Sequence, residues 1–160
     1  MSKRVLAIDP GPVQSALVEW DGERVVFAEI MPNGKLNEML LEMSISENYQ
    51  DVDLVIEQVV SYGMAVGAET FETVFWSGRF CESFGSLSVY RMPRQPVKLH
   101  LCHDSRAKDA NVSQAIRDRF GAPGTKKNPG ILYGIKSHLW SALALAVTFW
   151  DCPEKGGLVS

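Results

Sequence analysis

Residues 5–11, with the sequence VLAIDPG, are the stretch from which the fold can be argued. Apolar residues are followed by a carboxylate and then by Pro-Gly, a pattern typical of a strand buried on both faces that ends in a chain reversal. Burying the ionised carboxylate of Asp9 there is costly unless a cation or several donors compensate. A bound metal ion would compensate, and so would a turn capped by the Asp9 side chain. This segment alone leaves both interpretations open.

A second carboxylate interrupts the apolar run at residues 53–60, DLVIEQVV. An apolar strand offers Glu57 no evident partner, because its neighbours Ile56 and Val59 cannot replace lost hydration. If this strand lies beside the first, Glu57 and Asp9 can share a divalent ion, since hard cations such as Mg²⁺ bind carboxylate oxygens. The alternatives for Glu57 are a salt bridge to a nearby arginine or an edge-strand position that faces water.

The rest of the chain predicts strands and helices of a single domain, residues 1–160. With 46% hydrophobic residues, 160 positions suffice for one substantial core and are too few for two. Strands are expected at residues 15–20 and 24–30, joined by an Asp-Gly hairpin turn, and at 53–60, 88–92 and 97–102. Helices are expected at residues 37–46, 69–84, 110–120 and 137–149. Loops are expected at residues 61–68 and 121–134.

Charge is divided unevenly along the chain. The net charge of −3 argues against a nucleic-acid partner, but residues 1–80 carry 5 Lys and Arg against 13 Asp and Glu, and residues 81–160 carry 11 against 6. Between positions 91 and 136 the count is 10 basic to 3 acidic residues. This asymmetry indicates a face that binds a polyanion. The alternative is a solvated basic helix and loop without a partner.

Several function classes are disfavoured by composition. No run of 18 or more apolar residues occurs and the N-terminus has no signal-peptide pattern, so we expect a soluble, cytoplasmic protein with no membrane partner. The three cysteines are odd in number and widely spaced, which suits reduced thiols better than a disulfide framework or a zinc site.

Taken together, the order of elements and six short motifs resemble the RNase H-like nuclease fold, and more narrowly the RuvC-type Holliday-junction resolvases, especially their phage-encoded branch. The motifs are VLAIDPG at 5–11, VIEQV at 55–59, SGR at 77–79, VYRMPRQPVK at 89–98, RAKDANV at 106–112 and ALALA at 142–146. They follow the order of the family and span nearly the whole chain. The resemblance implies an α/β fold with a central mixed five-stranded sheet flanked by helices on both faces.

The resemblance also implies an activity. It is that of a metal-dependent endonuclease acting as a homodimer on Holliday junctions, forks and flaps, by attack of a metal-activated water that leaves 5′-phosphate ends. The setting would be recombination, repair or phage DNA processing in a bacterial or phage-infected cytoplasm. Asp9 and Glu57 match the first two metal-binding carboxylates of the family. Two Mg²⁺ ions, or Mn²⁺, are expected in each active site.

One departure from the family lies at the start of the final helix. The family usually presents two acids three residues apart, and here these positions hold His138 and Ser141. The spacing still places both side chains on one helix face, and a neutral imidazole can bind a metal or shuttle a proton. We therefore expect His138 as the third active-site residue; the alternative is a solvent-exposed helix start. Ser141 can hold at most a water, so Asp104 or Asp109, or more remotely Asp151, is a candidate for the missing carboxylate.

DNA contacts are expected from basic side chains in several motifs and from one loop aromatic. Arg106 and Lys108 stand where a phosphate can meet a helix N-terminus, although the Lys108-Asp109 order is swapped relative to the family. Tyr62 can stack on a base, although such residues more often pack onto the protein. The full set is Arg79, Lys98, Arg106, Lys108, Lys126, Lys127, Lys136 and Tyr62.

Two other functions remain as hypotheses. The first is a branched-DNA-binding protein of the same fold that has lost cleavage because its acidic set is incomplete. The second is a phosphotransferase or ATPase of the actin and sugar-kinase type, whose phosphate loop also follows a strand that ends in Asp. That architecture needs a duplicated lobe and a second Gly-rich loop, for which 160 residues leave no room.

Overall fold

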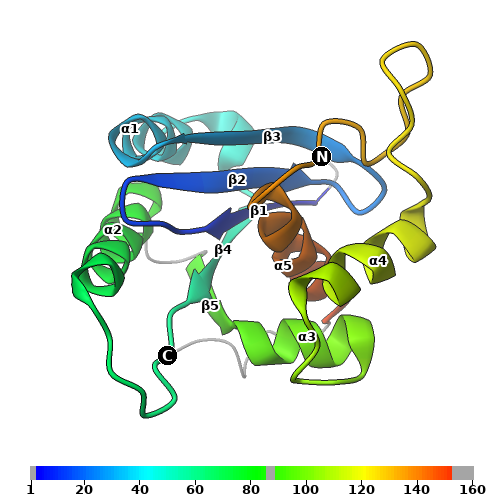
Figure 1. The fold of residues 1–160 in the computed structure, drawn as a ribbon. Coiled ribbons are helices and arrows are strands. Elements are labelled where there is room, and N and C mark those ends of the chain that lie inside the picture. Colours follow the sequence, from blue (N-terminus) through cyan, green and yellow to red (C-terminus); the bar gives the residue numbers. More distant parts are fainter. Residues whose placement is uncertain (1–2, 86–88, 153–160) are drawn as a thin grey trace.

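The structure, a computed structural model, describes residues 3–85 and 89–152 and contains one five-stranded sheet (Figure 1). Its strands are β1 (Arg4–Asp9), β2 (Gln14–Trp20), β3 (Val25–Pro32), β4 (Val52–Gln58) and β5 (Val89–Pro93), in the order β3-β2-β1-β4-β5. β1, β2 and β3 pair antiparallel, whereas β4 runs parallel to both β1 and β5. The mixed five-stranded sheet predicted from the sequence is therefore confirmed. The first residue of the strand expected at 88–92 lies outside the described residues.

Helices cover both faces of this sheet (Figure 1). They are α1 (Asn33–Ser44), the short 3₁₀ helix η1 (Glu47–Tyr49), α2 (Ala68–Phe84), α3 (Arg94–Cys102), α4 (Asp109–Phe120) and α5 (Leu139–Asp151). α1 and α2 pack on one face, and α5, backed by α3 and α4, packs on the other. Of the helices described, none has the length and hydrophobicity needed to cross a membrane.

β1 is buried on both faces, as its sequence predicts. Alternation along the strand turns Val5 and Ala7 toward α5, and Leu6 and Ile8 toward α1 and α2. All four side chains have 0% of their surface exposed. The part of α5 that packs on β1 is buried as well, since every residue from 142 to 149 is removed from solvent. The strand that carries Asp9 is thus the centre of the molecule.

The prediction of a strand at residues 97–102 is wrong, because this segment is part of α3. Its alternating apolar and polar residues suggested a strand, but Val97 and Leu101 are also four positions apart, which suits one helix face. Both pack against the core, whereas Leu99, which alternation would bury with them, is 56% exposed. Pro96 falls in the first helical turn, where its missing N–H has no intrahelical partner to lose.

Candidate active site

Asp9 is the last residue of β1 and Glu57 the last but one of β4, at the carboxyl ends of two neighbouring central strands. β1 and β4 are parallel and Ile8 pairs with Ile56, so the next residue of each strand is the acid. Asp9 is only 9% exposed, and Glu57 is partly buried. The structure therefore brings together the two carboxylates that the sequence analysis selected, from positions far apart in the chain.

Their shared environment makes ionisation of the two acids unfavourable. Burial first, and then the negative charge of Asp9, raise the pKa of Glu57 to about 7. Burial also raises the pKa of Asp9, although the hydrogen bond to His138 opposes the shift. Arg94 and Lys98 lower the pKa of Glu57 only in part. A divalent cation held between the two carboxylates would relieve both effects.

His138 joins this pair from the start of α5. Its Nδ1 lies 3.0 Å from Oδ2 of Asp9, a contact between residues 129 positions apart. The preceding residue, Ser137, has a left-handed backbone with φ of 49°, which turns the chain into the helix. The imidazole side chain is 69% exposed. His138 is thus both in contact with a site carboxylate and open to solvent.

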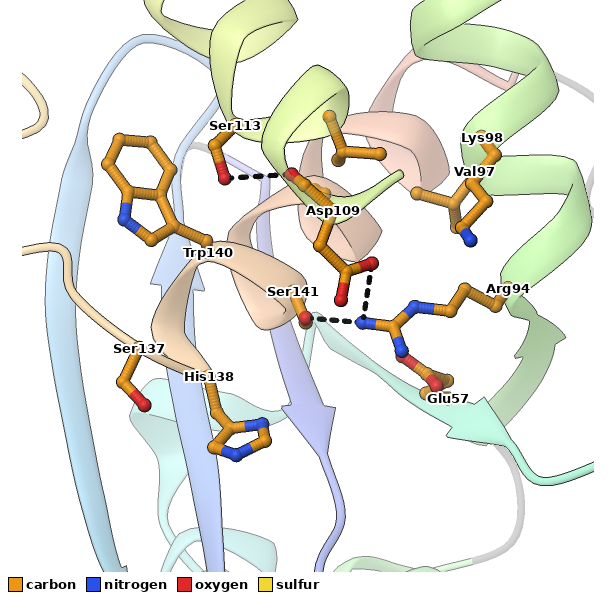
Figure 2. A pocket seen from close by; sticks show the side chains of 12 residues that line it. Glu57, Arg94, Val97, Lys98, Asp109, Ser113, Ser137, His138, Trp140 and Ser141 are labelled. Atoms are coloured by element: carbon orange, nitrogen blue, oxygen red, sulfur yellow. Dashed lines mark hydrogen bonds and ion pairs between the residues drawn. The ribbon is translucent and has the colours of Figure 1, made fainter. Parts of the chain in front are cut away.

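Arg94 is the site residue that the sequence analysis did not single out. It is the first residue of α3, directly after β5, and its Nη2 donates a hydrogen bond of 2.7 Å to Oγ of Ser141. The same nitrogen lies 3.5 Å from Oδ1 of Asp109. Figure 2 shows the guanidinium between these two side chains, with Glu57 beside it. The signal available in the sequence was an arginine within the motif at 89–98.

A pocket of about 210 Å³ opens beside these groups (Figure 2). Apart from Glu57, its walls are the first turns of three helices: Arg94, Val97 and Lys98 of α3, Asp109, Val112 and Ser113 of α4, and Ser137, His138, Trp140, Ser141 and Ala144 at the start of α5. Helix N-termini carry partial positive charge and bind phosphate groups. A second hollow of about 340 Å³ is lined by Asp9, the turn that follows it, and His138.

The turn after Asp9 is held by a buried polar network that the sequence analysis missed. Asn33, only 2% exposed, donates from Nδ2 to the carbonyl of Gly11 at 2.9 Å and accepts from Oγ of Ser15 at 2.6 Å. Oγ of Ser15 in turn accepts from the Gly11 amide at 3.1 Å. Asn33 begins α1, four positions before the expected helix start, and so ties this helix to the Asp9 turn.

The other candidate carboxylates differ in their positions. Asp109 and Ser141 both line the pocket. Asp104 lies outside it, exposed in the segment before α4, where it accepts a hydrogen bond from the Arg106 amide. Asp151, at the end of α5, pairs instead with Arg119 and His100.

The expected DNA-contacting residues are spread over a wider surface. Lys98 lines the pocket, and it is the one member of the set that does so. The others are exposed: Arg79 on α2, stacked over the ring of Trp76, Tyr62 in the β4–α2 loop, Arg106 and Lys108 before α4, and Lys126, Lys127 and Lys136 between α4 and α5. The structure thus leaves these side chains accessible to a large ligand and places most of them outside the pocket.

The residues present fit an open divalent-metal site. Within residues 3–85 and 89–152, no group of three or more His, Cys, Asp or Glu side chains is placed to hold a metal ion. Mg²⁺, however, is commonly held by one or two carboxylates together with waters and substrate phosphates. Asp9 and Glu57 supply such a pair, and His138 is a further donor beside Asp9.

Two solved structures of RuvC from Thermus thermophilus are similar to this chain. The RuvC structure superposes with a TM-score of 0.65 at 21% identity, covering 91% of this chain and 92% of that chain. RuvC in complex with a Holliday junction substrate gives a TM-score of 0.63 at 19% identity, covering 91% of each chain. The chain has the RuvC fold. No family model matches the sequence, and no curated protein does.

The RuvC fold agrees with the resemblance seen in the sequence motifs. It confirms the α/β, RNase H-like class, with its mixed sheet flanked by helices on both faces. At identities of 21% and 19% the likeness is one of fold. Membership of a phage-encoded branch stays a prediction.

Proposed function

We propose that this chain is a metal-dependent, structure-selective DNA endonuclease that resolves Holliday junctions and related branched DNA to 5′-phosphate ends. The observation that carries the proposal is the pair of carboxylates, buried Asp9 and partly buried Glu57, at the carboxyl ends of two adjacent parallel strands in a RuvC-fold sheet. A solved RuvC of this fold is bound to a Holliday junction substrate. The proposed setting is recombination or phage DNA processing in the cytoplasm, by a single nuclease domain.

Asp9 and Glu57 are the proposed ligands of Mg²⁺ or Mn²⁺, with His138 beside them. When bound, the metal supplies activation of water and stabilisation of charge on the phosphate. His138 contacts Asp9 while remaining open to solvent, a position from which a neutral imidazole can pass a proton between the site and water.

The positive groups of the pocket suit a phosphodiester. Arg94 offers a planar set of donors that matches phosphate oxygens, and Lys98 adds a second cation on the same helix. The starts of α3, α4 and α5 converge on the same pocket and add their partial charges. These groups would hold the scissile phosphate against the carboxylate pair and offset the charge that develops on it.

The proposed active form is a homodimer. α2 exposes an apolar strip formed by Phe71 (65%), Val74 (50%) and Phe75 (58%). Single exposed apolar residues are common, but a strip of this kind on one helix marks an interaction surface. Two copies joined through α2 would present two pockets to the two strands that a junction resolvase must cut.

A second candidate function is branched-DNA binding without cleavage. It is favoured by one observation: Arg94, not a carboxylate, contacts Ser141. The acidic set next to α5 is thereby smaller than the family pattern implies.

Incubation with labelled four-way junction, fork and linear duplex distinguishes these functions. In Mg²⁺ or Mn²⁺ we expect nicking of the branched substrates only, and none in EDTA. Glu57→Gln should slow cleavage at least about 100-fold, the scale on which loss of one charge-stabilising group acts. Glu42→Gln, which neutralises an exposed acid on α1, is the matched control and should cleave normally. Junction binding without cleavage in either metal would favour the binding protein, and equal digestion of linear duplex would contradict junction selectivity.

A further inference from the structure

Arg94 occupies one side of the pocket and is fixed there by two partners from different helices. Its Nη2 bonds Ser141 of α5 at 2.7 Å and lies 3.5 Å from the Asp109 carboxylate of α4. Its backbone leaves β5, the strand next to β4, so the side chain reaches across the end of the strand that carries Glu57. Figure 2 shows the guanidinium between Ser141 and Asp109, beside Glu57.

The opposite side of the site offers metal-binding donors instead of a guanidinium. There Asp9 contacts the imidazole of His138, a side chain whose ring nitrogens can bind a metal ion. Glu57 lies between the two sides, because its strand β4 lies between β1, which carries Asp9, and β5, which leads into Arg94. The donors that can hold a hard cation therefore gather around Asp9 and Glu57.

The side of Arg94 has little to offer a second metal ion. A guanidinium keeps its charge at every physiological pH and repels a divalent cation placed next to it. Asp109 is paired with that guanidinium. Ser141 provides a neutral hydroxyl, which already accepts a hydrogen bond from Arg94.

We infer that this chain holds a single divalent ion at Asp9 and Glu57, and that Arg94 supplies the second positive charge of the pocket as a built-in cation. The inference rests on the proposed nuclease function and revises the expectation of two ions per site. Arg94 would contact a non-bridging phosphate oxygen of the substrate, for which a guanidinium is well shaped. Asp109 and Ser141 then act as positioning residues for Arg94.

Titration of the purified full chain with Mn²⁺, by calorimetry and by the electron paramagnetic resonance of free Mn²⁺, tests this assignment. The wild type should bind one ion per chain. The double variant Arg94→Ala/Ser141→Asp, which removes the guanidinium and adds a carboxylate, should bind two. Arg94→Ala alone should tighten binding of the single ion about tenfold, because a nearby positive charge is lost. Circular dichroism checks that each variant is folded.

Two controls accompany the titration. Arg94→Lys keeps the charge, and Arg24→Ala removes an exposed arginine of the β2–β3 turn that pairs with Asp21; both should bind one ion. Two ions in the wild type, one ion in the folded double variant, or unchanged affinity in Arg94→Ala would each overturn the inference while leaving the nuclease proposal standing. No binding by any variant would overturn both.

Discussion

Ionisation of Asp9 and Glu57 lowers the free energy of unfolding of the metal-free protein, because both carboxylates are largely removed from water. Both pKa values are raised, in each case chiefly by burial. A group whose pKa is higher in the folded state than in the unfolded chain stabilises the fold at low pH and loses that contribution as the pH rises. Metal binding to the folded state alone would restore stability at higher pH.

The first prediction concerns Glu57→Gln in EDTA. Because the pKa of Glu57 moves from an ordinary 4.5 to about 7, wild-type stability should fall through that pH range relative to the variant. Linkage sets the size of the change at about 3 kcal/mol between pH 4.5 and pH 8. Urea denaturation of both proteins across this range measures the difference. Parallel pH profiles would show that Glu57 titrates normally.

Single residues also show how much of the candidate site could be predicted from the sequence. Asp9 and Glu57 were selected because a carboxylate in an apolar strand needs a partner, and His138 because it stands at one of the two positions where the resemblance to the RuvC-type resolvases implies an acid. Arg94 and Asn33 were missed, since their importance depends on the Ser141 hydroxyl and the Gly11 carbonyl, which lie 47 and 22 positions away along the chain. No local sequence pattern predicts contacts between residues so far apart in the chain.

Among the elements, the connection between α4 and α5 is a loop, as expected, but it is more ordered than its sequence indicated. Residues 121–134 read as a loop, yet within them Gly124 and Pro129 form an antiparallel bridge, and Thr125 and Asn128 exchange backbone hydrogen bonds of 3.0 and 3.1 Å. The result is a small hairpin that projects from the body (Figure 1). Lys126 and Lys127 are at its tip and exposed.

The second prediction is that this hairpin contacts the DNA backbone. Replacing both tip lysines, Lys126→Ala/Lys127→Ala, should weaken junction binding and reduce the slope of log K against log salt by about 1.8, since each phosphate contact contributes about 0.9. Fluorescence anisotropy at several salt concentrations, with EDTA to prevent cleavage, gives the slope. The matched control is Arg24→Ala/Lys35→Ala, which removes two exposed cations that already pair with acids. An equal loss of slope in both variants would exclude a specific role for the hairpin.

The elements also show where the periodicity of apolar residues fails to distinguish a strand from a helix. Strands β1 and β4 were predicted correctly because long apolar runs ending in turns have few other interpretations. The segment at 97–102 was not, because six residues satisfy a two-residue and a 3.6-residue repeat equally well. Only the packing of Val97 and Leu101 against the core decides between them.

At the scale of the whole molecule, charge and fold coincide. The segment with an excess of acidic residues, 1–80, includes β1 to β4, α1 and most of α2. The segment with an excess of basic residues, 91–136, includes α3, α4 and the hairpin. α3 and α4 supply half of the residues that line the pocket, and the start of α5 supplies most of the others. The basic segment of the sequence therefore lies on the face of the sheet that α3, α4 and α5 cover, where most of the proposed DNA contacts lie.

The third prediction concerns assembly. Phe75→Asp places a charge in the exposed apolar strip of α2 and should convert a dimer to a monomer in size-exclusion chromatography with light scattering. Leu99→Asp, at an equally exposed apolar position on α3, is the control and should leave the dimer intact. A wild-type monomer at all concentrations, or dissociation by both variants, would contradict an interface centred on α2.

The position of a bound metal ion tests the central claim most directly. Crystals of the protein soaked in Mn²⁺ and measured for anomalous scattering should show a peak within about 2.2 Å of a carboxylate oxygen of both Asp9 and Glu57. Glu57→Gln crystals treated in the same way should show the peak weakened or gone. Mn²⁺ bound only elsewhere, with Asp9 and Glu57 unoccupied at saturating metal, would contradict the account.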